Sequence, residues 1–332
     1  MPVAARPVEL DHVAHAVDHW RDIWDRYGFD LGARWMSGGP NRGFAPAQVR
    51  FRGGSRIEML MPWDVHHDDF LARFLERNGP GAHHLTFKVH DLRAALDHAR
   101  AAGFEPIGIE LSDPQWMEAF LHPKQAGGVV VQMAQTSLKT GEGTGWDVPP
   151  PDGFPTGRRP RRDGSGPIAP SRLDSVVHAV ADPGLGRALF VDLLRGTVVA
   201  GGHQGAVGWT DISWDGPLDL RLLWPHARGM TDATTGRPVT QTTSEDERAR
   251  RLAAWLGGRP GRVHHLEVRV DDPGGVPDAV PMSDPLSRLG STEGRHWELP
   301  AEANHGLRLA LIDTAASDGR AAVGSSDPTT PR

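Results

Sequence analysis

The chain has 332 residues, a length that suits two domains, and its 38% hydrophobic and 23% charged residues are typical of a soluble globular protein. The formal net charge of -6 argues against a nucleic-acid partner or an anionic membrane surface, because both require a basic face. The absence of cysteine excludes disulfides, thiolate zinc sites and cysteine nucleophiles, and the absence of a long apolar stretch favours a cytoplasmic protein without a membrane span.

The first part of the chain predicts two similar runs of strands and helices. The first run begins with a strand over 9–17 and an amphipathic helix over 18–27 that ends at Gly28. The other elements expected here are strands at 47–51, 56–61, 83–89, 117–122 and 128–133, and helices at 68–77 and 91–102. Residues 9–62 and 81–135 therefore each predict a β-α-β-β half-module, with room for one more strand. The two half-modules together make one domain.

A different composition follows. Residues 137–170 contain three consecutive prolines and the run Arg-Arg-Pro-Arg-Arg at 158–162, without apolar periodicity. This pattern predicts a Pro/Gly/Arg-rich linker with a solvated basic patch. The alternative for the basic run, a nucleic-acid-binding arm, lacks the interleaved aromatic residues that would support it.

The half-modules then return at 171–225 and 262–313. Helices are expected at 183–194 and 244–256, whereas Asp-Pro-Gly-Gly at 272–275 stands where the last helix should begin. The fourth half-module is therefore eroded. The tail 315–332 is small and polar, and we expect it to be disordered.

Three segments recur in the same order in the two halves. Residues 10–17 return as 173–180, residues 57–62 as 220–225, and residues 81–89 as 261–269. An ordered set of repeats indicates a duplicated domain. The first copy carries His12, Glu58 and His84, whereas the matching positions of the second copy are Ser175, Arg221 and His265. One histidine does not hold a metal, so the second copy reads as one that lost its ion.

These segments resemble the vicinal-oxygen-chelate superfamily, which includes glyoxalase I, extradiol dioxygenases and bleomycin-resistance proteins. The similarity is nearest to the methylmalonyl-CoA epimerase type in Leu-Asp-His-Val-Ala at 10–14, Glu-Met-Leu-Met-Pro at 58–62 and Gly-Ala-His-His-Leu-Thr-Phe at 81–87. The resemblance implies an α+β fold of tandem domains. Each domain would consist of two βαβββ modules that form an open, cup-shaped mixed sheet. We expect a metal-binding domain at 8–136 and a degenerate domain at 171–314.

The resemblance also implies a metal site. Carried over to this sequence, the ligands are His12, Glu58, His84 and Gln132. Two imidazoles, a carboxylate and an amide oxygen suit one divalent ion such as Zn, Ni, Co, Mn or Fe. A doubly charged ion with one glutamate leaves the site near +1, which favours a substrate that is, or becomes, an oxyanion.

Each candidate ligand has a simpler explanation. His12 and Gln132 could be ordinary hydrogen-bonded residues, whereas Glu58 lies in an apolar strand, where a buried carboxylate must be paired or bound to a metal. His83 and His84 are expected on opposite faces of a strand, so that only one enters the cup. We choose His84 because its segment aligns with that of His12, and expect His83 to be exposed or satisfied locally.

The catalytic candidate is Glu58. In much of the family the position of Gln132 is a glutamate that can act as a base, and a glutamine cannot abstract a proton. The strand 47–51, where a second base is expected, has no carboxylate. Glu58 is thus the carboxylate that can be placed on the metal, as a ligand and as the candidate base.

Three functions follow from this pattern. The first is a metal-dependent isomerase or lyase of the glyoxalase/epimerase type, acting on a small carbonyl or acyl-thioester substrate through a stabilised enolate. The alternatives are an extradiol-type ring-cleaving dioxygenase and a metal-free small-molecule binding or resistance protein. Each implies a small-molecule partner and a monomer or homodimer. The second domain is a structural partner, a lid or an anion pocket built on Arg221.

Overall fold

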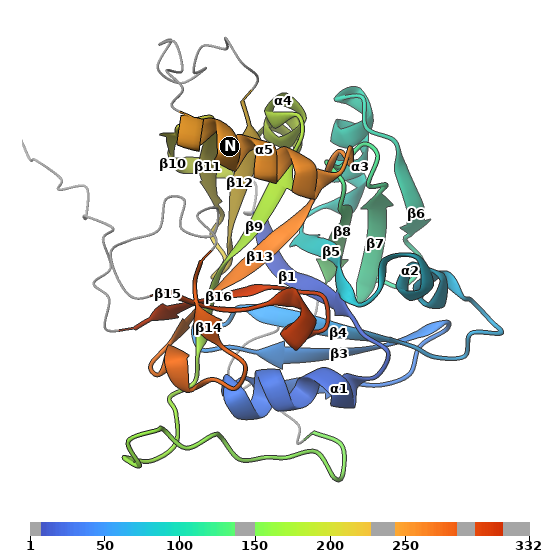
Figure 1. Ribbon diagram of the computed structural model, residues 1–332. Helices are drawn as coiled ribbons and strands as arrows, with labels where there is room; N and C mark the ends of the chain where they lie inside the picture. Colours follow the sequence, from blue (N-terminus) through green and yellow to red (C-terminus); the bar gives the residue numbers. More distant parts are fainter. Residues whose placement is uncertain (1–7, 137–149, 227–242, 284–295, 315–332) are drawn as a thin grey trace, which may run out of the picture.

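Two eight-stranded mixed sheets, each formed by one half of the chain, dominate the computed structural model (Figure 1). The structure describes residues 8–136, 150–226, 243–283 and 296–314. Both sheets are combined with a few short helices, which confirms the expected α+β fold of tandem modules. Within the described residues, no helix is long and apolar enough to cross a membrane.

The first sheet has the strand order β2-β3-β4-β1-β5-β8-β7-β6. Its central pair, β1 and β5, is antiparallel, whereas β1 pairs with β4 and β5 with β8 in parallel. The two modules therefore meet at β1 and β5, at the middle of the cup. The strands are β1 (Glu9–Ala16), β2 (Arg34–Gly38), β3 (Phe44–Arg50), β4 (Arg56–Pro62), β5 (Gly81–Lys88), β6 (Pro106–Glu110), β7 (Trp116–Leu121) and β8 (Val130–Thr136).

The second sheet repeats this order as β10-β11-β12-β9-β13-β16-β15-β14. The antiparallel pair β9 and β13 again occupies its centre. The repeated order is what duplication of the sequence predicts. Its strands are β9 (Arg172–Val180), β10 (Thr197–Gln204), β11 (Val207–Ser213), β12 (Asp219–Pro225), β13 (Gly261–Val270), β14 (Val280–Pro281), β15 (His296–Leu299) and β16 (Leu309–Asp313).

Sequence patterns missed the edge strands β2 and β6. In β2, neighbouring Trp35 and Met36 are both buried, and a register shift lies between Trp35 and Ser37, so the strand lacks alternation. In β6, Ile107 and Ile109 alternate with Gly108, but both side chains are exposed, so the strand has no buried apolar face. An edge strand has a neighbouring strand on one side only, so its alternation of buried and exposed residues is weak. Such a strand is difficult to predict from sequence.

Short helices pack against the two sheets. The first continues beyond Gly28 as a π-helix, contrary to the expected end at that residue. Glycine at this position leaves room for the Trp24 ring, because a Cβ on Gly28 would lie 2.5 Å from that ring. The helical segments are α1 (Trp20–Trp24) with Asp25–Asp30, α2 (Phe70–Asn78), α3 (Leu92–Ala101), α4 (Pro183–Arg187) with Ala188–Leu193, α5 (Thr243–Leu256), and short turns at Pro273–Gly275 and Ala301–Asn304. The single turn Pro273–Gly275 confirms the eroded fourth helix.

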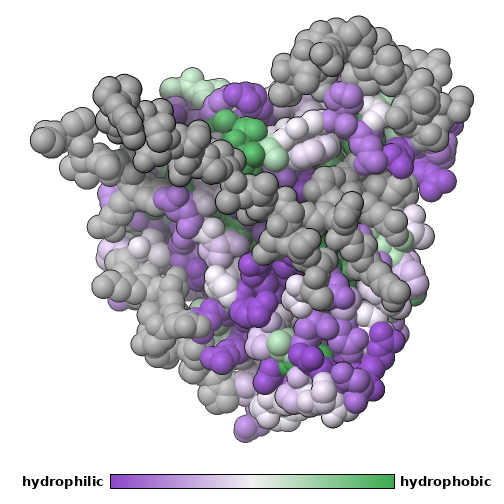
Figure 2. All heavy atoms as spheres, turned by 90° about the vertical axis from the view of Figure 1, so that its left-hand side faces the viewer, coloured by the Kyte–Doolittle hydropathy of each residue, from purple (hydrophilic) through white to green (hydrophobic). Residues whose placement is uncertain are grey.

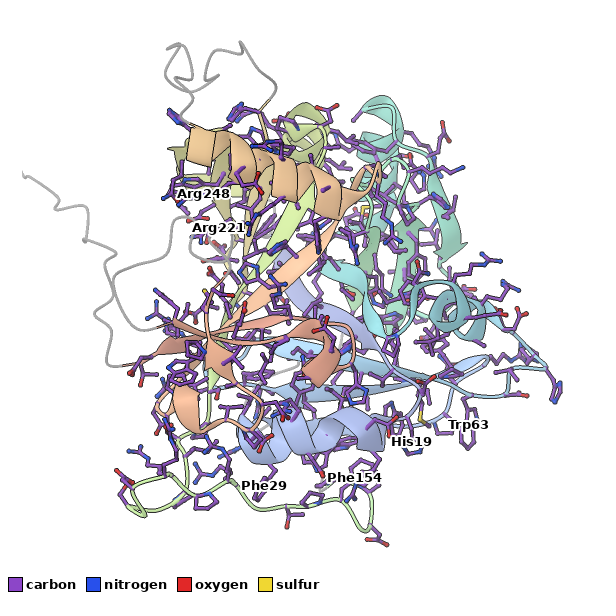
Figure 3. The ribbon with its side chains drawn as sticks, in the orientation of Figure 1. His19, Phe29, Trp63, Phe154, Arg221 and Arg248 are labelled. Atoms are coloured by element: carbon purple, nitrogen blue, oxygen red, sulfur yellow. The ribbon has the colours of Figure 1, made fainter. Side chains whose placement is uncertain are left out.

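Residues 150–170 pack against α1. The Trp24 indole donates to the Pro155 carbonyl at 2.8 Å, and its ring centroid lies 6.3 Å from that of Phe154. Figure 3 shows Phe154 beside α1, and Ile168 is fully buried. This part of the expected linker is therefore an ordered segment, whereas 137–149 lie outside the described residues.

The basic run 158–162 is only in part the solvated patch that its composition predicts, because Arg158 and Arg162 are exposed whereas Arg159 is buried. Arg159 is 7% exposed and its Nη1 lies 3.6 Å from Asp272 Oδ2, while Arg161 forms an ion pair with Asp271. The expectation fails for Arg159 and Arg161 because Asp271 and Asp272, which follow β13 about 110 residues further along the chain, pair with them. Composition alone could not place these carboxylates beside the run.

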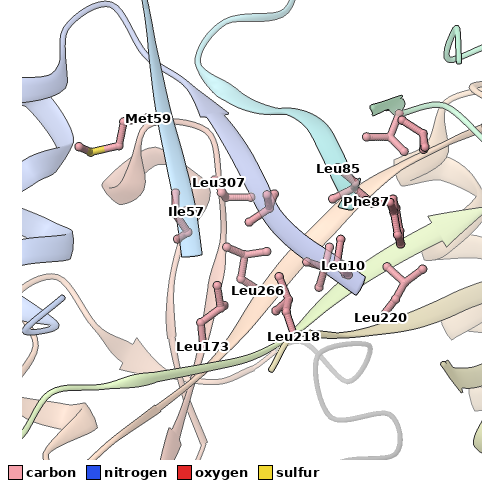
Figure 4. Close-up of a cluster of buried hydrophobic side chains, with 14 of the residues drawn as sticks. Leu10, Ile57, Met59, Leu85, Phe87, Leu173, Leu218, Leu220, Leu266 and Leu307 are labelled. Atoms are coloured by element: carbon pink, nitrogen blue, oxygen red, sulfur yellow. The ribbon is translucent and has the colours of Figure 1, made fainter. Parts of the chain in front are cut away.

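The two domains share one hydrophobic core. The Phe87 ring lies 5.1 Å from that of Trp214, which connects β5 to the second domain. Burial of each large side chain contributes about 1.5–3 kcal/mol, so the two sheets stabilise each other. Figure 4 shows part of this cluster, in which the labelled residues are Leu10, Ile57, Met59, Leu85, Phe87, Leu173, Leu218, Leu220, Leu266 and Leu307.

The backbones of the two domains touch at two places. At one, a turn of the first domain contacts the second domain, and at the other, a turn of the second domain contacts the first. A Cβ on Gly128, in the turn before β8, would lie 1.9 Å from the Gly261 carbonyl oxygen at the start of β13. A Cβ on Gly306, in the turn before β16, would lie 1.8 Å from the Pro80 oxygen. Glycine is required at both positions because the backbones touch.

Two buried histidines form hydrogen bonds to the same two turns, the one before β8 and the one before β16. His15 donates from Nε2 to the His305 carbonyl at 2.8 Å, and its Nδ1 accepts from the Tyr27 hydroxyl at 2.7 Å. His178, the equivalent residue of the second domain, donates from Nε2 to the Gly127 carbonyl at 2.8 Å. Burial lowers the pKa of each imidazole to about 4, and the backbone acceptor offsets this only in part. Both rings are therefore neutral in the folded protein at pH 7.

We expect these two histidines to make the protein acid-sensitive. An unfolded histidine titrates near 6.5, so between about pH 6.5 and 4 the unfolded chain binds protons that the folded chain does not. The contribution of these two rings to stability is therefore complete above about pH 6.5. It falls as the pH drops towards 4, by up to about 1.4 kcal/mol per pH unit for each histidine. Urea unfolding at a series of pH values measures this slope.

His178→Gln is the matched control. Its side-chain amide keeps a donor for the Gly127 carbonyl but does not titrate, so its stability should fall less steeply with acid than that of the native protein. Equal slopes for the two proteins would contradict the assignment.

On the face that carries the β10 edge, most of the coloured residues are hydrophilic, and a small hydrophobic area lies near the top (Figure 2). Val198 and Val199 of β10 are 43% and 52% exposed. Isolated exposed aliphatic residues of this kind are normal on protein surfaces.

Candidate metal centre

The four predicted ligands come together on one face of the first sheet. Glu58 of β4 and His84 of β5 both pair with the same residue of β1, and His12 of β1 lies two residues before that position. Gln132 of β8 pairs with Thr86, which in turn pairs with His12. Because side chains two residues apart share a face of a strand, all four point into the same cup.

The geometry of three of these residues suits a bound ion. Glu58 Oε2 lies 3.6 Å from His12 Nε2 and 3.5 Å from His84 Nε2, and the three ligand atoms all lie within 4.8 Å of one another. These separations are too long for hydrogen bonds. Ligand atoms about 2.0–2.2 Å from a shared ion would be spaced by roughly 3–3.5 Å. Among the described residues, this is the one group of three such side chains.

An unpartnered buried atom supports the same fit. His84 is 6% exposed, and its Nε2 has no hydrogen-bond partner. Burial, together with the neighbouring His83 and His12, holds the pKa of His84 well below its ordinary value, so the ring is neutral. A neutral imidazole with an unpartnered nitrogen beside a carboxylate is what a divalent ion requires.

Asp11 orients the ring of His12. Its Oδ2 accepts from His12 Nδ1 at 2.7 Å, and its Oδ1 contacts Arg56 Nη2 at 2.5 Å and Lys88 Nζ at 2.7 Å. Burial opposes a charge on His12, but the carboxylates of Glu58 and Asp11 outweigh it and raise the His12 pKa to about 9. A carboxylate behind a ligating histidine fixes the ring and turns Nε2 towards the ion. Nothing in the sequence pattern singled out Asp11 for this role.

A chain of hydrogen bonds orients the amide of Gln132. Its Nε2 donates to Glu118 Oε2 at 2.7 Å, and its Oε1 accepts from the Thr86 hydroxyl at 2.5 Å. The Thr86 oxygen also lies 2.8 Å from His12 Nε2. The arrangement directs the amide oxygen, rather than the nitrogen, towards the histidine side of the cup.

Glu118 was missed by the sequence reasoning. It lies on β7 between Trp116 and Phe120, and Phe120 pairs with Gln132. Its Oε2 also accepts from the Trp116 indole at 2.6 Å. Counting in steps of two along 116–121 places Glu118 on the same face as Trp116 and Phe120, but only the pairing of Phe120 with Gln132 shows which face that is. The weak pattern of the half-exposed strand hid this signal.

A β-bulge changes the expected orientation of His83. Ala14 pairs with His84 and His15 pairs with Ala82, which leaves His83 as an extra residue in β5. The two neighbouring rings therefore meet, with their Nδ1 atoms 2.9 Å apart, instead of pointing to opposite faces. The premise of opposite faces is wrong because a bulge breaks the alternation of a strand. His84 is nevertheless the ring that faces Glu58.

A pocket of about 290 Å³ opens beside Glu58. Its wall combines two cationic side chains, Arg56 and Lys88, with the apolar surfaces of Met36 and Trp116. Gln48, which pairs with Glu58 across β3 and β4, also lines it. The pocket gives a small molecule access to the Glu58 carboxylate.

The cup of the second domain is built differently at the same positions. Strand pairing confirms Arg221 as the equivalent of Glu58, and it makes Ala310 the equivalent of Gln132. Arg221 binds Asp211 through Nε at 2.6 Å and through Nη2 at 3.0 Å, and binds Glu267 through Nη1 at 3.0 Å. Figure 3 shows Arg221 on the second sheet. A guanidinium ion paired with two carboxylates favours a structural partner over an anion pocket.

Comparisons with known proteins agree with this architecture. Residues 4–120 match the family described as the glyoxalase/bleomycin resistance protein/dioxygenase superfamily. The chain is 30% identical over 132 residues to ethylmalonyl-CoA/methylmalonyl-CoA epimerase of Cereibacter sphaeroides, in a match that covers 38% of this chain and 96% of that protein. It is also 30% identical over 131 residues to mitochondrial methylmalonyl-CoA epimerase of Homo sapiens, covering 38% of this chain and 73% of the relative.

A solved structure matches both domains together. A triple mutant of 4-hydroxymandelate synthase from Streptomyces coelicolor superposes with a TM-score of 0.54 and 15% identity, covering 94% of each chain. At that identity the likeness concerns the fold alone. The chain belongs to the glyoxalase/bleomycin resistance protein/dioxygenase superfamily, and its N-terminal domain resembles the methylmalonyl-CoA epimerase type.

Proposed function

We propose that the first domain, residues 8–136, is a metal-dependent isomerase or lyase of the glyoxalase/epimerase type. Its substrate would be a small carbonyl compound or acyl thioester with an acidic α-proton. The observation that carries the proposal is the cluster of His12, Glu58 and His84, whose ligand atoms lie within 4.8 Å of one another around an unpartnered buried nitrogen. The likeness to two acyl-CoA epimerases favours the acyl thioester.

The ligands would be His12, Glu58, His84 and Gln132. A divalent ion held there would stabilise the negative charge that develops on a substrate carbonyl oxygen when an α-proton is lost. The hydrogen bonds that the chain already makes would keep the ligands in place, because Asp11 fixes His12 and Glu118 fixes the Gln132 amide. Such prior orientation lowers the cost of binding the ion.

Glu58 is proposed to remove and return the α-proton. Its carboxylate is half-buried, lines the pocket and therefore can reach a bound small molecule. Gln48, its cross-strand neighbour in the pocket, carries no ionisable group and cannot share the task. Glu118 already accepts two hydrogen bonds, from Trp116 and Gln132, which makes it a weaker candidate.

The second candidate is an oxygen-dependent reaction of the extradiol type. Two histidines and one carboxylate are also the ligand set of non-haem Fe(II) oxygenases, so His12, Glu58 and His84 fit this chemistry too. The two reactions differ in their need for oxygen and in the metal that supports them.

The second domain, residues 171–314, is proposed to act as a structural partner that completes the shared core. The segment 137–170 joins it to the first domain. Because both cups lie in one chain, a monomer or a homodimer would suffice for the proposed reaction. Size-exclusion chromatography with light scattering would distinguish the two states.

Exchange of the α-proton in D₂O tests the proposed reaction directly. The protein is treated with a chelator, reloaded with Co²⁺, Ni²⁺, Mn²⁺, Zn²⁺ or Fe²⁺, and mixed with methylmalonyl-CoA or ethylmalonyl-CoA under nitrogen. We expect deuterium at the α-carbon by mass spectrometry in at least one reloaded sample, and none in the chelated one. Absence of exchange with every ion, together with oxygen consumption on catechol by the Fe²⁺ form, would replace this function with the dioxygenase.

A further inference from the structure

We infer that His83 is a positioning residue for His84. It accepts the Nδ1 proton of His84 and thereby leaves the lone pair of His84 Nε2 directed at Glu58. The inference rests on the proposed function, because a bound ion is what needs that lone pair. His83 itself does not face the ion.

The spacing of the two rings limits where the proton can lie. The two Nδ1 atoms are 2.9 Å apart, which is a hydrogen-bond distance. Two N–H groups facing each other at this distance would clash, and two lone pairs would repel. One proton therefore lies between the rings, either on His84 or on His83. These two arrangements give His84 opposite tautomers.

Only one arrangement is compatible with an ion. If His84 carries the Nδ1 proton, its Nε2 lone pair is free, and Nε2 is the atom that lies 3.5 Å from Glu58 Oε2. If His83 carries the proton, His84 Nε2 is protonated and cannot bind a metal. An ion thus selects the tautomer in which His83 is the acceptor. Without that acceptor, the buried N–H of His84 would lose its hydrogen bond.

The β-bulge and α2 hold His83 in this position. The bulge turns the His83 ring to the same side as the ring of His84. The ring of Phe74, on α2, contacts the His83 ring at a centroid distance of 4.7 Å, and that of Phe70 lies at 6.0 Å. A ring that is packed in this way keeps its acceptor nitrogen aimed at its neighbour. Bulges beside functional sites commonly re-aim one side chain.

The second domain supplies a natural control. His264 is likewise the extra residue of a bulge in β13, and its Nδ1 lies 2.7 Å from His265 Nδ1. Its ring contacts Trp255 of α5 at 4.7 Å, as His83 contacts Phe74. The cup in front of His265 holds Arg221 instead of a ligand set. Replacing His83 in the first domain and His264 in the second by the same residue therefore distinguishes a role in metal binding from a role in stabilising the fold.

Three variants test the inference. His83→Phe keeps an aromatic ring but removes the acceptor, His83→Asn keeps an acceptor oxygen near the position of Nδ1, and His264→Phe makes the equivalent change in the second domain. Co²⁺ titration calorimetry of the metal-free full-length proteins gives the Kd. We expect His83→Phe to weaken binding about 10- to 100-fold, as removal of such a supporting partner does, and the other two variants to bind within about 3-fold of the native protein.

A second readout follows the proton itself. In ¹⁵N-histidine spectra of the Zn²⁺-loaded native protein, we expect His84 to carry its proton on Nδ1, with a downfield hydrogen-bonded resonance. That resonance should move upfield in His83→Phe and stay in place in His83→Asn. A merely structural role would not distinguish these two variants.

The possible failures are separable. His83→Phe binding Co²⁺ as tightly as the native protein, or His264→Phe weakening binding to the same degree, overturns the inference while the proposed function stands. His83→Asn binding as weakly as His83→Phe also overturns it, because the acceptor would then be irrelevant. A native protein that binds no divalent ion removes the proposed function and this inference together.

Discussion

Glu58→Ala and His84→Ala should each lose the divalent ion and, with it, exchange of the substrate α-proton. Glu58 is the charged member of the set, and its Oε2 lies about equally far from His12 Nε2 and His84 Nε2, at 3.6 and 3.5 Å. Removal of a ligand should cost more than the roughly 10- to 100-fold that supporting partners contribute. We therefore expect each variant to contain much less than one equivalent of metal per chain after dialysis. Elemental analysis of the purified proteins measures it.

The second domain again offers the matched control for this experiment. His265 occupies the position equivalent to His84, and its Nε2 is also buried without a hydrogen-bond partner. His265→Ala should keep one equivalent of metal and the full exchange rate. Loss of metal from His265→Ala, or retention of one equivalent by both Glu58→Ala and His84→Ala, would place the ion elsewhere.

The identity of the retained metal carries further information. Exchange supported by Co²⁺, Ni²⁺ or Mn²⁺ without oxygen agrees with the proposed isomerase or lyase. Iron as the retained metal, with activity that needs oxygen, agrees instead with the two-histidine, one-carboxylate oxygenases. The elemental result is thus read together with the deuterium experiment.

Arg221→Ala should destabilise the protein by about 3–5 kcal/mol, because it leaves the buried carboxylate of Glu267 and the partly buried one of Asp211 without their cation. Arg221 is 8% exposed and binds both Asp211 and Glu267. Those carboxylates raise its pKa further, against the effect of burial, so the guanidinium remains charged. Urea unfolding at pH 7 measures the loss. The first domain should retain its metal, because its cup is separate.

A companion variant separates the charge from the packing. In Arg221→Met with Glu267→Gln, the cation and one of its carboxylates are removed together, so we expect part of the lost stability to return. The anion-pocket hypothesis for Arg221 predicts something different. Under that hypothesis Arg221→Ala would raise the KM for an anionic substrate while leaving the unfolding free energy nearly unchanged.

Much of the fold could be predicted from the sequence because its signals are local or repeated. The alternation of 9–17 and the order of three recurring segments indicate the duplicated sheets before any contact is known. The three residues His12, Glu58 and His84 stand out for a related reason. Each lies in a recurring segment, and the resemblance to the vicinal-oxygen-chelate superfamily marks all three as metal ligands.

Only the tertiary structure decides how these residues are supported. The bulge at His83 arises from the pairing of β5 with β1, which lies about 70 residues earlier, so alternation within β5 gives the wrong orientation. Glu118 meets Gln132 through strand pairing. Asp271 and Asp272 reach the basic run through packing of the domains.

The physical reason is the same in each case. A local pattern reports which face of a strand or helix is apolar, because burial acts on every residue of that face. The partner of a polar group is set by pairing and packing between distant segments, and hydrogen bonds and ion pairs depend on positions to within a few tenths of an ångström. The sequence therefore predicts the cup and its candidate ligands. The partners that orient them, and the guanidinium of Arg221 bound to Asp211 and Glu267 in the second cup, emerge only when the chain is folded.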